Sequence, residues 1–388
     1  QDRLAELRKL IRQPSINFGS RIANPNLSVF ANRQGLSCLE WGFAGHSWKQ
    51  MLSSYCKDEP LAGFLDFFKH ICCNAATTHF SIGRPPSMTD EGRESLLSQW
   101  ADPPSDSELR RVGLAERVAS IKQAISNAPA IGDRDIRVSV QGSYRHNTIV
   151  RMDRDVDIYV ILMDIFTTDY AFARGFSDKK LKLYDATYSS PRFKNDLETA
   201  FIAAYGRGYV RRGSKGFTIK ENNIHRVNTA VVAGVEHRRY RPDGSYDSGM
   251  TLRPDNGDPF ESWPEQHYQN GEVKNHKTER RYRRFVRIMK KLCDYMARHG
   301  YQQAKVIPSY LNECLVYNIP NSLMSAGRLS DNLHEMLIYL RQTLGTDENC
   351  RKWLEVTEMN YLFHSSRPWT REQVLDWILA AWEWLEYE

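Results

Sequence analysis

Apolar residues between positions 96 and 265 recur at helical spacing in some stretches and in short strand-like runs in others. A helix ending near Asn127 is predicted because its apolar residues fall every three or four positions: Leu109, Val112, Val118, Ile121 and Ile125. Strands are predicted at Asp135–Val140, Ile158–Met163, 208–215 and 224–240, with a loop and helix over Asp164–Ser190 and a helix at Leu197–Tyr205. This alternation predicts an α/β core.

The pattern becomes helical towards the C-terminus. Lys277–Gly300 is predicted as one helix with a buried stripe, which consists of Tyr282, Phe285, Met289, Leu292 and Met296. Its cations, among them Arg280, Arg284, Arg287 and Lys291, form a basic face that is predicted to be mostly solvated. Further helices are predicted at Leu333–Leu344 and Thr370–Trp384, so the chain should end in a helical lobe.

Residues 1–95 carry a weaker pattern. Asp2–Gln13 and Leu61–Cys73 have the spacing of helices, while Asn17–Gly42 is rich in Asn, Ser and Gly and favours loops. The cysteines and histidines of this part lack the spacing of a zinc site, so buried free thiols are the better interpretation. We interpret residues 1–95 as an N-terminal extension of unknown role.

Composition excludes several classes of protein. The 388 residues are 41% hydrophobic and 26% charged, which is ordinary for a globular protein, and no apolar run is long enough to span a bilayer. Seven irregularly spaced cysteines argue against a disulfide framework, and the N-terminus lacks an apolar signal-peptide region. A cytoplasmic protein without a membrane partner is therefore expected. The net charge of +6 allows polyanionic ligands without requiring nucleic acid.

The stretch Gln141–Met163 carries the clearest chemistry. Asp155 and Asp157 are two positions apart at the start of a predicted strand, so their carboxylates should share one face. Such a pair repels itself unless a cation lies between the two groups, and a hard ion such as Mg²⁺ suits it. Upstream, Gly142 and Ser143 would let backbone N–H groups and a hydroxyl approach a phosphate. The stretch indicates a site for a nucleoside triphosphate and metal ions.

This stretch resembles the cGAS/DncV-like nucleotidyltransferases (CD-NTases), relatives of the oligoadenylate synthetases, in which a Gly-Ser turn precedes Asp-x-Asp on the next strand. Three later segments also resemble that family: 224–240, Lys277–Gly300 and Ile307–Pro320. The resemblance implies an α/β (α+β) fold with a polymerase-beta-like mixed-sheet core at 96–265. A helical C-terminal lobe at 266–388 would face the core across a nucleotide cleft, with residues 1–95 as an extra segment.

The resemblance also implies the site residues. Asp155 and Asp157 would hold the metal, Mg²⁺ or Mn²⁺, and the nucleotide would be bound by Gln141, Gly142, Ser143, Lys290, Ser309 and Tyr310. Lys290 occupies the position of the lysine that reaches the triphosphate in the family. Ser309 would face a phosphate or serve as a plain helix N-cap, and Tyr310 would stack on a base or pack in the core.

One position departs from the family. The family's third catalytic acid falls at position 230, which is Ala230 here, and position 228 on the same face is Asn228. Glu236 is no simple substitute, since the family has an acid there as well. Two carboxylates would still bind a metal and a nucleotide but should support transfer poorly. Either an aspartate has been replaced at Ala230, or the protein binds nucleotides without transferring them.

The function implied by the resemblance is synthesis of a cyclic di- or trinucleotide second messenger from NTPs, including ATP, in bacterial anti-phage (CBASS) defence. An effector would respond to the product, and a regulatory protein partner is a further expectation. Two alternatives remain: a nucleotide-binding pseudoenzyme or sensor, and a linear or RNA-directed nucleotidyltransferase. RNA bound on the Arg280–Lys291 face, with affinity that falls steeply with salt, would favour the last.

Overall fold

Helices and strands alternate through residues 107–262, as the hydrophobic pattern predicts. The computed structural model describes residues 88–104, 107–151, 155–221, 228–325 and 327–387. All of these belong to the unit that runs from Ile82 to Glu388. The helices and loops expected before residue 88, and the cysteine and histidine positions there, lie outside the described residues. The proposed domain limits at 95/96 and 265/266 stay predictions.

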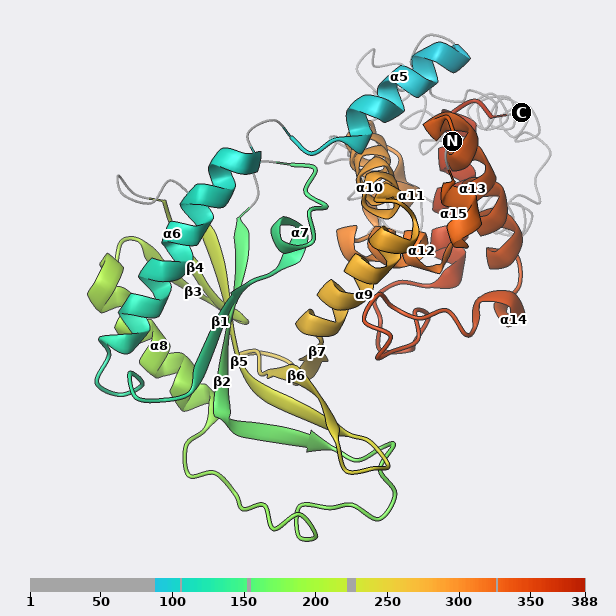
Figure 1. Ribbon diagram of the computed structural model, residues 1–388. Coiled ribbons are helices and arrows are strands. Elements are labelled where there is room, and N and C mark those ends of the chain that lie inside the picture. Colours follow the sequence, from blue (N-terminus) through green and yellow to red (C-terminus); the bar gives the residue numbers. More distant parts are fainter. Residues whose placement is uncertain (1–87, 105–106, 152–154, 222–227, 326, 388) are drawn as a thin grey trace, which may run out of the picture. The chain divides into compact units, whose positions relative to one another are not determined.

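A mixed seven-stranded sheet forms the first part of this unit (Figure 1). Its main strand order is β1-β2-β5-β4-β3, and β6 pairs with both β5 and β7. The strands are β1 (Ile136–Val140), β2 (Val156–Asp169), β3 (Val210–Gly213), β4 (Gly216–Ile219), β5 (Thr229–Tyr240), β6 (Tyr246–Leu252) and β7 (Phe260–Ser262). The central pair β2–β5 is parallel and the other recorded pairs are antiparallel. The predicted mixed sheet is confirmed.

Two helices, α6 (Ser107–Ser126) and α8 (Ser190–Tyr205), lie against this sheet (Figure 1). The α8 residues Phe193, Leu197 and Phe201 are fully buried, and they share a core with the alternate residues of β2. Burial of one side chain of this size contributes about 1.5–3 kcal/mol. This packing fixes β2, the strand that carries the Asp-x-Asp pair, in the middle of the sheet.

The second part of the unit is helical. Its longer helices are α5 (Asp90–Ala101), α9 (Pro264–Lys277), α10 (Arg281–Arg298), α12 (Ser309–Asn318), α13 (Leu329–Leu344) and α15 (Arg371–Trp384). Short helices are α7 (Gly142–Arg145) in the sheet part and α11 (Gln302–Lys305), η2 (Asn321–Met324) and α14 (Asp347–Cys350) in this one. All residues of the stripe predicted for α10 are buried in one core with α12, α13 and α15, which confirms that prediction.

Several predicted element boundaries are wrong. Strand β2 continues to Asp169, paired with β5 across a register shift, and no helix forms between residues 170 and 189. No helix or strand is predicted between Tyr240 and Lys277, where the chain forms β6, β7 and α9. In each case the residues are too polar or too irregularly spaced to show a period, and pairing with neighbouring elements decides the structure.

The basic face of α10 is not mostly solvated, contrary to the prediction. Arg287 is buried, and its guanidinium donates to the carbonyl oxygens of Ala101 and Asn147 at 2.6 Å each. Lys291 donates to the carbonyl of Gln99 (3.1 Å). These cations thus satisfy carbonyl groups at the C-terminal end of α5, where helical carbonyls lack intrahelical partners. Among the described residues, no helix combines the length and apolar character needed to cross a membrane.

Candidate functional site

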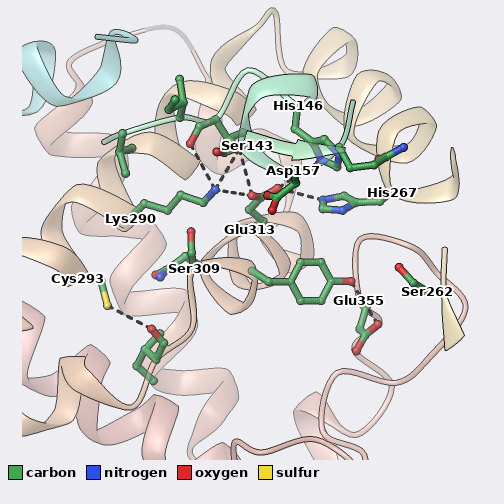
Figure 2. A pocket seen from close by; sticks show the side chains of 18 of the residues that line it. Ser143, His146, Asp157, Ser262, His267, Lys290, Cys293, Ser309, Glu313 and Glu355 are labelled. Carbon is green, nitrogen blue, oxygen red and sulfur yellow. Dashed lines mark hydrogen bonds and ion pairs between the residues drawn. The ribbon is translucent and has the colours of Figure 1, made fainter. Parts of the chain in front are cut away.

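A cavity of about 620 Å³ lies between the sheet and the helical part (Figure 2). Of the residues named from the sequence, those lining it are Gln141, Gly142, Ser143, Asp155, Asp157, Lys290, Ser309 and Tyr310. They come from the α7 turn, the start of β2, α10 and α12. The structure therefore brings together segments that are separated by up to about half of the chain. The roles assigned to these residues stay predictions.

The Gly-Ser turn is built against the Asp-x-Asp pair. Gly142 begins α7 with a positive φ of 66°, and a Cβ atom there would lie 2.3 Å from Oδ2 of Asp157. The backbone N–H of Gln141 donates to the carbonyl of Asp157 (2.8 Å). Only glycine combines this backbone conformation with this close approach. The glycine thus allows the Asp157 carboxylate to lie directly against the turn.

Position 230 lies next to Asp157 in the sheet. In the parallel pair β2–β5, Asp157 is in register with Ala230, and neighbouring residues in register point to the same face. Asn228 is exposed just before β5, and its side-chain oxygen accepts from the N–H of Glu221. Glu236 is buried and paired with Arg238 at 2.7 Å, and it is not among the cavity-lining residues. A methyl group therefore lies beside Asp157 in the sheet, and Ala230, like Glu236, is not among the cavity-lining residues.

Lys290 reaches the cavity but is already paired. Its side chain is buried, and its ammonium donates to a carboxylate oxygen of Glu313 and to the hydroxyl and carbonyl of Thr148 (3.0 and 3.3 Å). Figure 2 shows the side chains of Lys290 and Glu313 pointing toward one another. A triphosphate would meet this ammonium together with its carboxylate partner.

Glu313 is the centre of a cluster that the sequence reasoning missed. Its Oε1 accepts from the Thr148 hydroxyl (3.1 Å) as well as from Lys290, and its Oε2 accepts from Nε2 of His267 (3.0 Å). Nδ1 of His146 lies 3.7 Å from the same Oε2, and the two imidazole rings are in edge contact. The sequence offered one signal, because His146 and Glu313 both lie inside segments that resemble the family.

Burial and charge set the ionisation of this cluster. Burial alone would raise the pKa of Glu313, but the Lys290 ammonium and the contacts with His146 and His267 hold it well below its ordinary value. Burial lowers the pKa of His146 to about 4, so this ring is neutral at pH 7. One ring nitrogen of each of His146 and His267 and one carboxylate oxygen of Glu313 lie within 4.8 Å of one another, a spacing that would suit a metal ion. The ammonium on the same carboxylate, however, already supplies the balancing positive charge.

Ser309 and Tyr310 begin α12 at the cavity. Pro308 is the N-cap, and no side chain caps this helix, so the interpretation of Ser309 as a plain N-cap is wrong. Ser309 is instead the first helical residue and lines the cavity. The Tyr310 ring is half-buried, its hydroxyl donates to Glu355 (3.2 Å), and burial raises its pKa well above the usual range. The ring packs against the helical core and also lines the cavity, and its stacking on a base stays a prediction.

Comparisons with known proteins agree with this architecture. Residues 269–386 match the family model of the cGAS/DncV-like nucleotidyltransferase C-terminal helical domain. A cyclic dipyrimidine nucleotide synthase, CdnE of Legionella pneumophila, is 37% identical over 295 residues, which span 76% of this chain and 98% of that protein. A second, from Cecembia lonarensis, is 36% identical over the same shares of each chain.

Solved structures with this fold are similar as well. The structure of the Rhodothermus marinus CdnE c-UMP-AMP synthase with Apcpp and Upnpp matches with a TM-score of 0.65. It is 26% identical and covers 76% of this chain and 98% of that one. Since the alignments span nearly the whole of these relatives, the similarity includes both the sheet part and the helical part.

Proposed function

This chain belongs to the cGAS/DncV-like nucleotidyltransferases, and we propose that it joins nucleoside triphosphates into a cyclic di- or trinucleotide. The observation that carries the proposal is the cavity. Asp155 and Asp157 line it beside the Gly142–Ser143 turn, and Ser309 and Tyr310 line it from α12. Because two relatives at 37% and 36% identity are named cyclic dipyrimidine nucleotide synthases, pyrimidine nucleotides are the first substrates to test.

The proposed reaction is a transfer at phosphorus. The oxygen of a ribose hydroxyl forms a bond to the α-phosphate of a second triphosphate, the bond from that phosphate to the β-phosphate breaks, and pyrophosphate leaves with the electron pair. A second transfer closes the ring. The proton of the hydroxyl must pass to a base, and an aspartate at position 230, in register with Asp157, would be close enough to accept it.

The donor set fits a hard divalent cation. Asp155 is exposed at the start of β2, Asp157 is half-buried, and both carboxylates line the cavity. A bound Mg²⁺ or Mn²⁺ would reduce the negative charge of the triphosphate and stabilise the leaving pyrophosphate. In this arrangement Asp155 and Asp157 hold the ion, and the Gly-Ser turn orients the phosphates beside it.

Because position 230 is alanine, the proposal takes two forms. In the first, Ala230 replaces an aspartate of the natural protein, and this chain is an impaired synthase. In the second, alanine is natural, and the protein is a nucleotide-binding pseudoenzyme or sensor. Both forms keep the two carboxylates and the turn, so both predict metal-dependent nucleotide binding. They differ in whether an aspartate at this position yields product.

The test compares this chain with Ala230→Asp and with Ala230→Asn, which has similar size but no charge. Each is incubated with the four labelled NTPs and Mg²⁺ or Mn²⁺, and phosphatase-resistant products are separated. We expect product from Ala230→Asp at a rate at least about a hundredfold above the other two, because only it restores a third acid and base. Nucleotide binding without product from any of them would contradict the synthase form.

The biological setting follows from the family. We propose anti-phage (CBASS) signalling in the bacterial cytoplasm, with the product acting on an effector and a regulatory protein acting on the enzyme. An RNA-directed transferase is less well supported, because Arg287 and Lys291 of the basic α10 face are bonded to backbone carbonyls at the end of α5. Those two cations already donate hydrogen bonds within the protein and are therefore not free to bind RNA phosphates.

A further inference from the structure

Four consecutive residues after the Gly-Ser turn, Arg145–Thr148, are all held by the helical part. Arg145 forms two hydrogen bonds to Glu265 of α9, at 2.9 and 2.7 Å. The carbonyl of Asn147 accepts from Arg287 of α10 (2.6 Å). His146 and Thr148 both face Glu313 of α12. This segment is therefore the point at which three helices of the second part contact the phosphate-facing turn of the first.

The same segment fixes the turn itself. The N–H of Thr148 donates to the carbonyl of Ser143 (2.9 Å), and the N–H of His146 donates to the carbonyl of Gly142 (3.2 Å). A displacement of Thr148 would thus move Ser143 directly. Gly142 in turn contacts the carboxylate of Asp157. The position of Arg145–Thr148 determines where the turn lies relative to the metal-binding carboxylates.

Glu313 is the most highly connected side chain of this contact. An ionised carboxylate has about four places for hydrogen-bond donors. Three are taken, by Thr148, Lys290 and His267, and His146 lies next to the remaining one. The side chain is only 7% exposed. Most of the acceptor capacity of Glu313 therefore already serves protein groups, and the side chain acts through the groups that it holds.

We propose that Glu313 is a positioning residue for the nucleotide: it fixes the Lys290 ammonium and the Arg145–Thr148 segment so that both face the polyphosphate. This inference rests on the proposed nucleotide site and adds a residue to it. Glu313 binds the buried Lys290 ammonium, and through Thr148 it fixes the position of the Gly-Ser turn. We assign it a positioning rather than a catalytic role, because its oxygens accept from protein donors.

Without the charge of Glu313, the buried Lys290 ammonium would have no counter-charge. Lys290 is 4% exposed, and an ammonium buried without a counter-charge loses its proton more readily. The other groups facing the pair cannot replace the carboxylate. His146 is neutral, His267 donates to Glu313, and the hydroxyl of Tyr282, whose pKa burial raises well above its usual value, donates to the Glu313 carbonyl (3.4 Å).

The experiment measures the Kd of the full chain for a non-hydrolysable Mg-NTP analogue between pH 6.0 and 9.0. For Glu313→Gln we expect the affinity to fall about tenfold more than that of the unaltered chain between pH 6.5 and 8.5, because the buried ammonium then lacks its counter-charge. In Lys290→Met/Glu313→Gln this extra pH dependence should be absent, with weak binding at every pH. A merely structural role for Glu313 would weaken binding equally across the range.

Glu355→Gln is the matched control. Glu355 also lines the cavity, is 1% exposed and is paired with Arg367, but it has no recorded contact with Lys290. Its variant should keep the pH profile of the unaltered chain. Parallel profiles for Glu313→Gln and Glu355→Gln would overturn the proposal.

The double variant keeps the proposal testable if Glu313→Gln alone does not fold, since it removes both buried charges together. Affinity of the double variant equal to that of the unaltered chain would also overturn the proposal. The experiment measures nucleotide binding rather than product. A chain that binds nucleotide but makes no product would therefore contradict the proposed synthase activity but not the role proposed for Glu313. A chain that binds no nucleotide contradicts both.

Discussion

At the scale of single residues, the close approach of Gly142 to Asp157 is the tightest constraint in the site. We predict that Gly142→Ala lowers stability by about 1–3 kcal/mol, because the residue must keep a left-handed conformation and its Cβ would displace the Asp157 carboxylate. Metal-dependent nucleotide binding should fall at least about tenfold, since this carboxylate is a proposed metal ligand. Chemical denaturation and calorimetric titration measure the two effects.

The variant Gly257→Ala tests the effect of backbone strain without a clash like that between a Cβ atom at Gly142 and the Asp157 carboxylate. Gly257 has a positive φ of 97°, but a Cβ atom there would have no atom within 4 Å. This variant should show the stability loss without the loss of nucleotide binding. Equal loss of binding in both variants would mean that the contact with Asp157 is unimportant.

The sequence identified eight of the cavity-lining residues because short segments encode them. Two positions on one strand share a face whatever the rest of the chain does, so Asp155 and Asp157 could be paired from their spacing alone. Glu313 could not be found in this way. Its partners His146 and His267 precede it by 167 and 46 residues in the chain, and no local period relates such positions.

At the scale of elements, one side chain joins α5, α10 and the segment after α7. Arg287 is 5% exposed, and burial lowers its pKa to about 10, so it remains charged at neutral pH. We predict that Arg287→Met destabilises the protein by about 2–4 kcal/mol, because the carbonyls of Ala101 and Asn147 would lose their donor. Equilibrium denaturation measures this loss.

Arg298→Met on the same helix is the control for this prediction. Arg298 is exposed and pairs with Asp294 one turn away. Exposed pairs of this kind contribute less than about 0.5 kcal/mol. If the two variants were equally stable, the proposed link between α5, α10 and the segment after α7 would contribute nothing.

The elements that the sequence missed share a physical property. In α9 the buried residues are Pro264, Gly271 and Asn275, so the helix has no apolar stripe to recognise. The helix is held instead by contacts such as the Arg145–Glu265 ion pair. The stripe of α10, by contrast, packs in the main helical core and could be identified from its spacing.

At the scale of the whole molecule, the contact between sheet and helical part should be sensitive to acid. His146 has a pKa of about 4 when folded, against about 6.5 in an unfolded chain. Protons thus bind the unfolded state more tightly. The stabilisation is complete above about pH 6.5 and is lost as the pH falls towards 4, to a total of about 3 kcal/mol.

We therefore predict that His146→Asn loses less stability than the unaltered chain between pH 7.5 and pH 4.5. The free energy of unfolding at the two pH values measures this difference. His364→Asn, at an exposed position, should retain the full acid sensitivity. Identical pH dependence in all three proteins would show that burial of His146 does not govern the acid stability of this contact.

The sequence by itself determined the family, the mixed sheet with its helical lobe, and the Gly-Ser and Asp-x-Asp positions. These follow from periods and short spacings, which backbone geometry converts into shared faces. Ala230 is in register with Asp157 in the sheet, and its assignment as the position of the third acid stays a prediction. Only the tertiary structure decided that Lys290 is paired with Glu313, that Arg287 is buried and that Ser309 is not a cap. Those facts depend on how α7, α9, α10 and α12 pack together, because a side chain's partner is set by proximity in space rather than by spacing along the chain.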